Sequence, residues 1–157
     1  MDTELGEIVS EAANSVYEEL GGGLSECIYR NALAIALRKL GCTVEAEVIV
    51  PIFYQAQYVG SLRPDIVVNK QVVLELKAVA KVTESHISQT RGYLRWLPPV
   101  PTIYQLPLIQ SRMRGAVLNF GVEELEIRHV PTPLKVAECR PPAWVVDAEG
   151  QCRVRYN

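Results

Sequence analysis

The chain has 157 residues, of which 48% are hydrophobic and 22% charged, a composition typical of one folded globular domain. A chain of this length buries enough surface to fold without disulfide or metal support, which argues against disorder over most of it. The net charge of −2 argues against a protein that coats nucleic acid through bulk electrostatics, and the longest apolar run, from Val48 to Tyr54, is far shorter than the roughly 20 residues of a membrane-spanning helix.

The N-terminus and the cysteines bear on location and redox state. The first four residues, Met1-Asp2-Thr3-Glu4, are acidic where a secretory signal is basic, so we expect an intracellular protein, cytoplasmic or nuclear. The 4 cysteines have no Cys-x-x-Cys spacing, which argues against a zinc knuckle or a redox pair and favours reduced thiols.

Charge is distributed unevenly along the chain. Residues 1–60 carry nine acidic and three basic residues, whereas residues 61–157 carry nine acidic and thirteen basic ones. A surface that faces phosphate is therefore expected from the second part. The alternative is that these bases are scattered over a solvated surface, and the sequence leaves both interpretations open.

Two helices are predicted at the start of the chain. Apolar residues recur at intervals of three and four from Leu5 to Leu20, which is the period of an amphipathic helix over residues 3–20. Gly21-Gly22-Gly23 ends this helix because three glycines lose too much backbone entropy to continue it. The pattern resumes at Leu24 and stops at Gly41, which predicts a second helix over residues 24–40.

Three strands are predicted next. Alternation of apolar and polar residues from Val44 to Ile52 is typical of a half-buried strand. Residues 58–68 and 71–78 are rich in β-branched and apolar residues and are separated by the turn-forming pair Asn69-Lys70. These two segments are therefore expected to pair as a hairpin.

A third helix and two more strands complete the predicted core. Thr83 is the expected N-cap of a helix that ends near Leu97, before two prolines. Residues 98–113 contain four prolines and are expected to form a loop or insert. Residues 115–120 are expected to form a buried strand, and a further strand begins at Leu125.

The tail is predicted to be separate from this core. It contains four prolines and is expected to end in a hairpin from Trp144 to Arg155, with its turn at residues 147–150. We therefore predict one domain over residues 1–130 and a C-terminal extension over residues 131–157 that packs on it.

Candidate catalytic residues lie on the predicted hairpin. Glu75 and Lys77 are two positions apart on a strand and therefore project from one face, where a carboxylate and an ammonium can serve one site. Asp65 lies opposite Glu75 only if the turn has an odd number of residues, such as Asn69-Lys70-Gln71, or contains a bulge. A two-residue turn would place Asp65 opposite Leu74 instead.

Two carboxylates on adjacent strands form an oxygen-ligand site that suits Mg²⁺ or Mn²⁺, and a nearby lysine can orient or deprotonate the attacking water. The simpler interpretation is that Glu75-Leu76-Lys77 is the solvated face of an amphipathic strand. The preceding Pro64-Asp65 pair makes that interpretation less favourable.

These residues also resemble a known signature. Pro64-Asp65 followed by Glu75-Leu76-Lys77 resembles the motif of the PD-(D/E)XK nuclease superfamily. Gly23-Leu-Ser-Glu26-Cys-Ile-Tyr29 resembles the Gly-x-x-Glu-x-x-Tyr motif of the GxxExxY family within it. Further matches, which extend the resemblance over residues 5–130, are Glu19-Leu20-Gly21, His86-x-x-Gln89-x-x-x-Tyr93-Leu94 and Leu118-Asn119-Phe120-Gly121.

The resemblance implies an α/β fold with a restriction-endonuclease-like αβββαβ core. The sequence pattern adds an extra N-terminal helix and a C-terminal β extension to this core. The resemblance further implies that Asp65 and Glu75 bind Mg²⁺ or Mn²⁺, with the Leu76 carbonyl as a further ligand. It also implies that Lys77 positions the attacking water and that Glu26 reaches the same site, as a ligand or through water. The insert at residues 98–113 and the tail depart from the family pattern.

The third predicted helix has a polar stripe that is expected to line this site. The stripe contains His86, Gln89, Tyr93 and Trp96, and the neighbouring apolar stripe, which includes Leu94, should face the core. Gln89 is the expected support for the ligands or contact for phosphate. The alternatives are that His86 is a polar residue at a helix start and that the two aromatic residues only pack.

Further substrate contacts are expected from an aromatic residue and from arginines. Tyr29 is one turn after Glu26 and either fixes that carboxylate through a hydrogen bond or only packs. The planar guanidinium fork suits phosphate, so the following arginines are candidates: Arg30, Arg63, Arg91 and Arg95.

The leading hypothesis is a metal-dependent nuclease that hydrolyses phosphodiester bonds, and the alternative is a non-catalytic nuclease-fold module that binds nucleic acid or protein. Nucleic acid, with DNA favoured, is the expected partner, a membrane is not, and a homodimer through the proline-rich insert is a further expectation. Because clustered carboxylates repel one another, we also expect a raised pKa in at least one of them.

Overall fold

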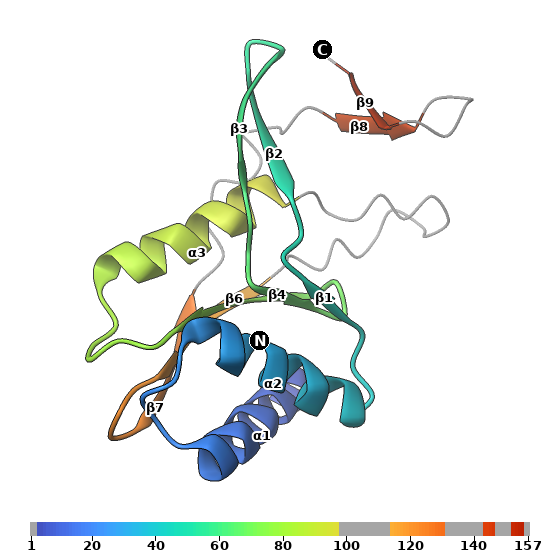
Figure 1. Ribbon diagram of the computed structural model, residues 1–157. Coiled ribbons are helices and arrows are strands. Elements are labelled where there is room, and N and C mark those ends of the chain that lie inside the picture. The colour runs from blue at the N-terminus through green and yellow to red at the C-terminus, as the bar shows by residue number, and fades with distance from the viewer. Residues whose placement is uncertain (1–2, 98–113, 131–142, 147–151, 156–157) are drawn as a thin grey trace.

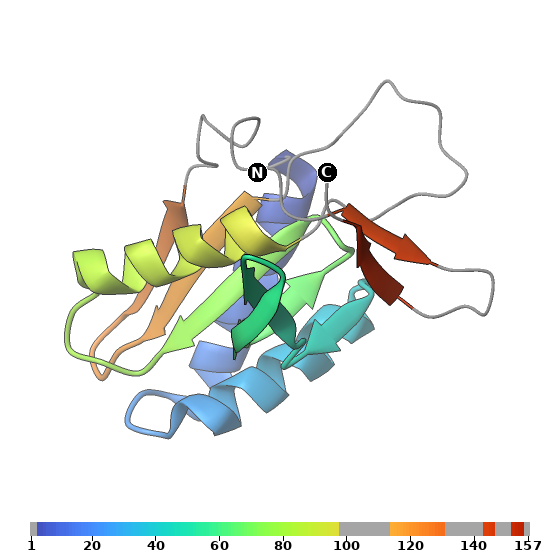
Figure 2. The ribbon, with the colours of Figure 1, turned by 90° about the horizontal axis from the view of Figure 1, so that it is seen from above.

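The computed structural model describes residues 3–97, 114–130, 143–146 and 152–155, and its elements are arranged as three layers (Figure 1). Helices α1 (Thr3–Leu20) and α2 (Glu26–Lys39) cover one face of a central sheet, and α3 (Glu84–Trp96) covers the other. Seen from above, α3 crosses the sheet on the side opposite to α1 and α2 (Figure 2). None of the described helices is both long and apolar enough to cross a membrane.

The central sheet has five strands in the order β1-β4-β5-β6-β7. Only the pairing of β5 with β6 is parallel, and the other three pairs are antiparallel. The strand bounds are Val44–Ala46 for β1, Ile66–Val68 for β4, Val72–Lys77 for β5, Arg114–Phe120 for β6 and Leu125–Val130 for β7.

Strand β5 lies at the centre of the sheet and separates two cores. Val72, Leu74 and Leu76 pack among the buried residues of α1 and α2, whereas Val73 packs beneath α3 with residues such as Leu94. A strand that is covered on both faces needs apolar residues at consecutive positions, which accounts for the run Val-Val-Leu at its start. By the same alternation, Glu75 and Lys77 lie on the α3 face.

Most of the predicted elements are confirmed. Helices α1, α2 and α3 and strands β6 and β7 lie where the periodicity placed them. Thr83 caps α3 in a capping box, in which the Thr83 N–H donates to Nδ1 of His86 at 3.1 Å. The predicted C-terminal hairpin is present as β8 (Ala143–Val146) paired with β9 (Cys152–Arg155), whereas its turn and the insert at residues 98–113 lie outside the described residues.

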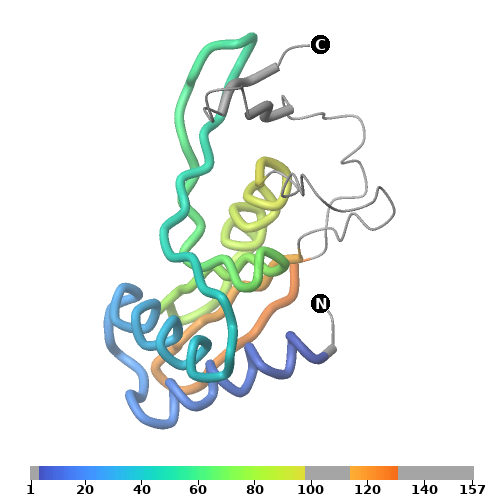
Figure 3. Tube along the Cα trace, turned by 90° about the vertical axis from the view of Figure 1, so that its right-hand side faces the viewer, coloured from blue at the N-terminus to red at the C-terminus, as the bar shows by residue number. Residues whose placement is uncertain are grey.

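The prediction of continuous strands over residues 44–52 and 58–68 was wrong. Each segment is divided, so that β2 (Val50–Tyr54) and β3 (Gln57–Leu62) form a separate hairpin. The first break is at Glu47, whose φ is 51°, and the second is at Pro64, which has no N–H to donate to a ladder. Alternation of apolar and polar residues indicates an extended backbone but does not show where that backbone bends. The β2–β3 hairpin projects away from the sheet on the α3 side (Figure 3).

The glycine turn between α1 and α2 docks against the turn between β6 and β7. Tyr17 at the end of α1 donates its hydroxyl to the Gly121 carbonyl at 2.9 Å. A Cβ atom on Gly22 would lie 2.6 Å from the same carbonyl oxygen and 2.6 Å from the Cα of Val122. Because these are backbone atoms, they cannot move aside as the end of a flexible side chain can.

We therefore expect Gly22→Ala to lower the free energy of unfolding by roughly 1–3 kcal/mol through overpacking. The matched control is Gly92→Ala in the interior of α3, where a Cβ meets nothing within 4 Å. This control should gain about 0.5–1 kcal/mol because alanine loses less backbone entropy in a helix. Urea unfolding of both variants measures the two effects, and a neutral Gly22→Ala would contradict the close approach.

Candidate metal and catalytic site

The candidate site lies where β5 extends beyond β4. The ladder between these strands pairs Ile66 with Leu74 and Val68 with Val72, so β4 ends before β5 reaches Glu75. The chain bends away at Pro64, and the Asp65 side chain takes the place of the missing strand. Its Oδ2 accepts a hydrogen bond from the Leu76 N–H at 2.8 Å. Asp65 is thereby fixed beside the exposed end of β5.

The register brings Asp65 and Glu75 together. The turn between β4 and β5 has three residues, Asn69-Lys70-Gln71, which is the odd-numbered alternative left open by the sequence. Asn69 and Lys70 adopt φ values of 50° and 53°, and the Asn69 Oδ1 accepts from the Thr43 N–H at 2.7 Å. Extending the ladder by one pair places Asp65 opposite Glu75, on the same face.

Glu75 is the buried carboxylate of the site. Its residue is 4% exposed, and its Oε1 lies 3.3 Å from the Nζ of Lys77. Its Oε2 is buried and accepts no hydrogen bond of normal length from the described residues, although the Tyr93 hydroxyl is near enough to lower the pKa of this carboxyl. A buried carboxylate oxygen without a partner is costly, so this atom is the clearest sign of a site that binds something further.

The pKa values of both carboxyl groups are raised. Burial raises the pKa of Glu75 to about 7, and the neighbouring Asp65 charge adds to this effect, while Lys77 opposes it. Burial also raises the pKa of Asp65, against the opposing effects of the Leu76 N–H and the Arg30 guanidinium. The expected raised pKa is confirmed, although its largest cause is desolvation and repulsion between carboxylates comes second.

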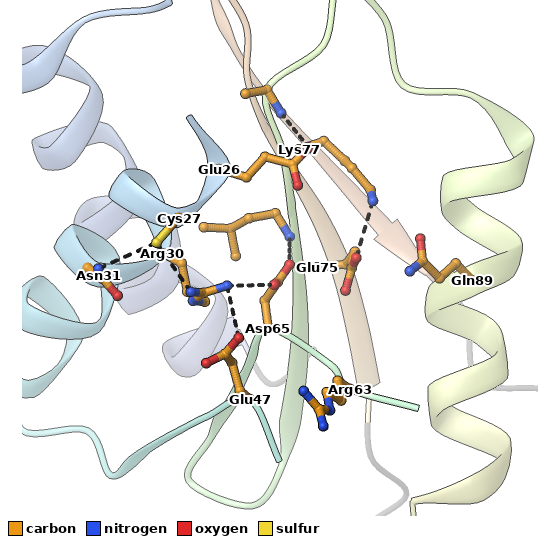
Figure 4. Close-up of polar contacts among 12 residues, drawn as sticks. Glu26, Cys27, Arg30, Asn31, Glu47, Arg63, Asp65, Glu75, Lys77 and Gln89 are labelled. Carbon is orange, nitrogen blue, oxygen red and sulfur yellow. Dashed lines mark hydrogen bonds and ion pairs between the residues drawn. The ribbon is translucent and has the colours of Figure 1, made fainter. Parts of the chain in front are cut away.

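Helix α2 contributes polar side chains to the other side of Asp65 (Figure 4). The Glu26 Oε1 accepts from the Ala78 N–H, just beyond β5, at 3.4 Å. The Arg30 guanidinium lies 3.6 Å from the Asp65 Oδ1 and 3.5 Å from the Glu47 Oε1. Arg30, which was expected to contact phosphate, is therefore engaged by carboxylates in this structure.

Helix α3 closes the site from the opposite side. The Tyr93 hydroxyl accepts from the Gln89 Nε2 at 2.8 Å and donates to the Arg63 carbonyl at 3.5 Å. Gln89 is exposed and points from α3 towards Glu75, whereas Leu94 is buried, as the helix periodicity predicted (Figure 4). Burial and the nearby Glu75 carboxylate raise the pKa of Tyr93, so its hydroxyl stays protonated.

For two expected substrate contacts, Tyr29 and Tyr93, the structure favours the packing alternative. Tyr29 is fully buried, stacks on Phe120 with ring centroids 4.5 Å apart, and donates its hydroxyl to the Gly21 carbonyl at 2.6 Å. It therefore neither holds Glu26 nor faces a substrate. Tyr93 is 3% exposed and lies beneath the site, where it supports Gln89.

The remaining expected contacts are on the surface. His86 is half-buried at the start of α3, and its Nδ1 accepts the capping hydrogen bond from Thr83, which favours the alternative of a helix-start residue. Arg63 is exposed on the connection between β3 and β4. Arg91 lies 3.8 Å from Glu84 on the surface of α3, and Arg95 is exposed near its end.

Glu26 lies near Asp65, but it is not arranged with Asp65 and Glu75 as a third direct ligand in the described residues. Within the part of the chain that the structure describes, no group of three or more His, Cys, Asp or Glu side chains is arranged to hold a metal ion. Glu26 is close enough to Asp65 to raise the pKa of that carboxyl, but its oxygen is bonded to the backbone of Ala78. The carboxylate pair is therefore Asp65 and Glu75.

Sequence reasoning assigned no role to two residues that shape the site, although one of them, Asn119, lies in a motif match. Glu47 appeared to be one polar position of an alternating strand, yet its side chain contacts Arg30 and its N–H donates to the Asp65 carbonyl at 3.0 Å. Asn119 on β6 is buried and forms two hydrogen bonds of 3.0 Å with the N–H and carbonyl of Val79. The available signal for Asn119 was a polar residue within an apolar strand.

Comparison with known protein families identifies the superfamily of the chain. The family model of the PD-(D/E)XK nuclease superfamily matches residues 3–130, which include every residue of the site. The chain belongs to the PD-(D/E)XK nuclease superfamily. No curated protein and no solved structure matches the chain. The mixed five-stranded sheet with helices on both faces is consistent with the restriction-endonuclease-like fold of this superfamily.

PD-(D/E)XK nucleases generally use divalent metal ions, and the residues present fit such an ion. Asp65 and Glu75 supply hard carboxylate oxygens from one face of the sheet, and the buried Oε2 of Glu75 has an unused acceptor position. Lys77 neutralises only part of the charge because it lies against the other oxygen of Glu75. The donor set therefore suits Mg²⁺ or Mn²⁺ better than a softer metal.

The raised pKa of Glu75 predicts a pH dependence of stability in a chelator. In the folded protein Glu75 keeps its proton up to a pKa of about 7, whereas a glutamate in the unfolded chain releases it near its ordinary pKa of 4.5. The stabilisation from this proton is therefore complete at pH values below the pKa of Glu75 in the unfolded chain. It is lost as the pH rises through the pKa of Glu75 in the folded protein. Between about pH 5 and pH 8 the free energy of unfolding should fall by up to about 3 kcal/mol.

Urea unfolding at both pH values measures this loss, and Glu75→Gln should remove most of it. The control is Glu126→Gln on β7, whose carboxylate forms a partly exposed pair with Arg128 at 3.4 Å. This control should keep the wild-type dependence. An equal loss of stability in wild type and Glu75→Gln would show that Glu75 does not titrate in this range.

Proposed function

We propose that this protein is a metal-dependent nuclease that hydrolyses phosphodiester bonds in nucleic acid. The observation that carries the proposal is the buried Glu75 carboxylate, which faces Asp65 and Lys77 and has an oxygen without a partner among the described residues. A structural carboxylate in such a position would be expected to have both oxygens bonded. Membership of the superfamily supports the same chemistry.

In the proposed mechanism, Asp65 and Glu75 hold Mg²⁺ or Mn²⁺, with the Leu76 carbonyl as a further ligand. The bound ion supplies positive charge that offsets the charge developing on the phosphate and the leaving group. Lys77 donates from the same face and orients the attacking water. Gln89, fixed by its hydrogen bond to Tyr93, supports the ligands or contacts phosphate from α3.

Glu26 has a secondary role in this proposal. Its bond to the Ala78 N–H fixes the backbone just beyond Lys77, and it is near enough to Asp65 to act through a water molecule. We further propose that the chain is a GxxExxY protein. The motif tyrosine, Tyr29, then closes the glycine turn before α2 through Gly21 and Leu24, so that Glu26 begins the helix at a fixed place.

The substrate is proposed to be DNA, contacted by the exposed Arg63 and by other bases of the second part of the chain. An intracellular location and a homodimer remain predictions. The insert at residues 98–113, which was expected to form the dimer contact, lies outside the described residues, as does most of the proposed extension at 131–157.

The second candidate is a non-catalytic module that keeps the nuclease fold to bind nucleic acid or protein. It is favoured by the Arg30 guanidinium, which lies 3.6 Å from the Asp65 Oδ1 and already balances part of the charge of the site. Such a module should bind its partner equally well with and without metal.

Replacement of Lys77 by Met distinguishes the two functions. We expect Mn²⁺-dependent cleavage of DNA or RNA by the wild type, and a loss of at least about 100-fold in Lys77→Met, because the group that orients the water is gone. Lys81→Met is the control, since Lys81 is exposed four positions further on. Nuclease assays with duplex and single-stranded substrates measure this, and metal-independent binding without cleavage would favour the module.

The metal ligands are tested separately by Asp65→Asn. Asparagine can still accept the hydrogen bond from the Leu76 N–H. The raised pKa of Asp65 indicates that its charged form destabilises the folded protein. In chelator, this variant should therefore melt at or above the wild-type temperature. It should lose most of the stabilisation that millimolar Mn²⁺ gives to the wild type. Thermal melts with chelator and with Mn²⁺ decide this, and an undiminished gain from Mn²⁺ would remove Asp65 from the ligands.

A further inference from the structure

Arg30 lies between two carboxylates at the edge of the site. Its guanidinium Nη1 is 3.6 Å from the Asp65 Oδ1 and 3.5 Å from the Glu47 Oε1. The side chains of Arg30 and Asp65 are each 18% exposed, whereas that of Glu47 is 57% exposed. Arg30 therefore contacts one shielded and one solvated carboxylate with the same nitrogen.

The contact with Asp65 involves the oxygen that a metal ion would need. Oδ2 of Asp65 is bonded to the Leu76 N–H, which fixes the end of the ladder, and Arg30 lies against Oδ1 (Figure 4). Two cations at one carboxylate oxygen repel each other strongly where water is largely excluded. Arg30 and a divalent ion are consequently alternatives at this oxygen.

Glu47 is positioned so that it can keep its contact with Arg30 when the contact between Arg30 and Asp65 is broken. Its N–H donates to the Asp65 carbonyl at 3.0 Å, so the two acidic residues are joined through their backbones. Glu47 adopts a φ of 51°, which is uncommon for a residue with a Cβ and turns the chain between β1 and β2. The guanidinium then needs only a small rotation to leave one carboxylate and remain on the other.

We propose that Arg30 is an intramolecular competitor of the divalent ion for Asp65, and that once the ion binds, Arg30 keeps Glu47 as its carboxylate partner, beside its hydrogen bond to the Cys27 sulfur at 3.4 Å. The inference rests on the proposed function only for the role of Asp65 as a ligand. Arg30 is thus a positioning residue, which balances the charge of Asp65 in the metal-free protein and sets how tightly the ion is held.

The first test is the affinity of the full-length chain for Mn²⁺, measured by calorimetry at fixed ionic strength. Arg30→Gln should bind Mn²⁺ about tenfold more tightly than wild type, which corresponds to about 1.4 kcal/mol. The control is Lys39→Gln, which removes the same charge from the exposed last residue of α2 and should differ little from wild type. Unchanged or weaker binding by Arg30→Gln would overturn the inference.

The second test concerns Glu47 and does not depend on how well Arg30→Gln folds. Glu47→Gln leaves Asp65 as the carboxylate partner of Arg30 and should weaken Mn²⁺ binding several-fold more than Glu45→Gln, which removes the same charge two positions earlier on β1. In the Arg30→Gln background this extra weakening should disappear, because the coupling acts through Arg30. Equal effects of the two glutamate variants would overturn the inference.

The outcomes also separate this inference from the proposed function. If neither wild type nor Arg30→Gln binds Mn²⁺, both the metal-dependent nuclease and the competition are wrong. If both bind with the same affinity and that affinity falls in Asp65→Asn, the proposed ligand stands and only the competition is wrong. Tighter binding by Arg30→Gln together with the Glu47 coupling supports both.

Discussion

The hydrogen bond from the Leu76 N–H to the Asp65 Oδ2 is the interaction on which the site depends. A strand at the centre of a sheet normally has both edges paired by backbone, but the chain bends away at Pro64 and leaves the end of β5 without a neighbouring strand on that side. The carboxylate replaces one backbone acceptor. It thereby satisfies the ladder and at the same time fixes an acidic group beside Glu75.

The electrostatics of the site follow from the position of β5. Because this strand is covered on both faces, Glu75 projects into a region with little water, and its raised pKa reports the cost of that position. Lys77 and the Tyr93 hydroxyl reduce this cost for Glu75 without removing it, and Arg30 reduces the corresponding cost for Asp65. The fold thus holds an unfavourable charge that a bound cation would stabilise.

Residues away from the chemistry hold this arrangement in place. Tyr29 stacks on Phe120 and closes the turn before α2, which positions Glu26 and Arg30 at the end of the sheet. Asn119 fixes Val79 with two hydrogen bonds and so continues the pairing of β5 with β6 beyond Lys77. In the structure, the role of these residues is to place other groups.

The sequence by itself determined the helices, the central strands and the shared face of Glu75 and Lys77, because each depends on a local period and on caps such as Thr83. Only the tertiary structure decided the turn length that brings Asp65 opposite Glu75, the departure of β2 and β3 from the sheet, and the pairing of Arg30 with Asp65 and Glu47. Apolar and polar residues alternate in the same way in a strand that continues and in one that bends. A contact between residues 35 positions apart, such as Arg30 and Asp65, leaves no periodic pattern in the sequence.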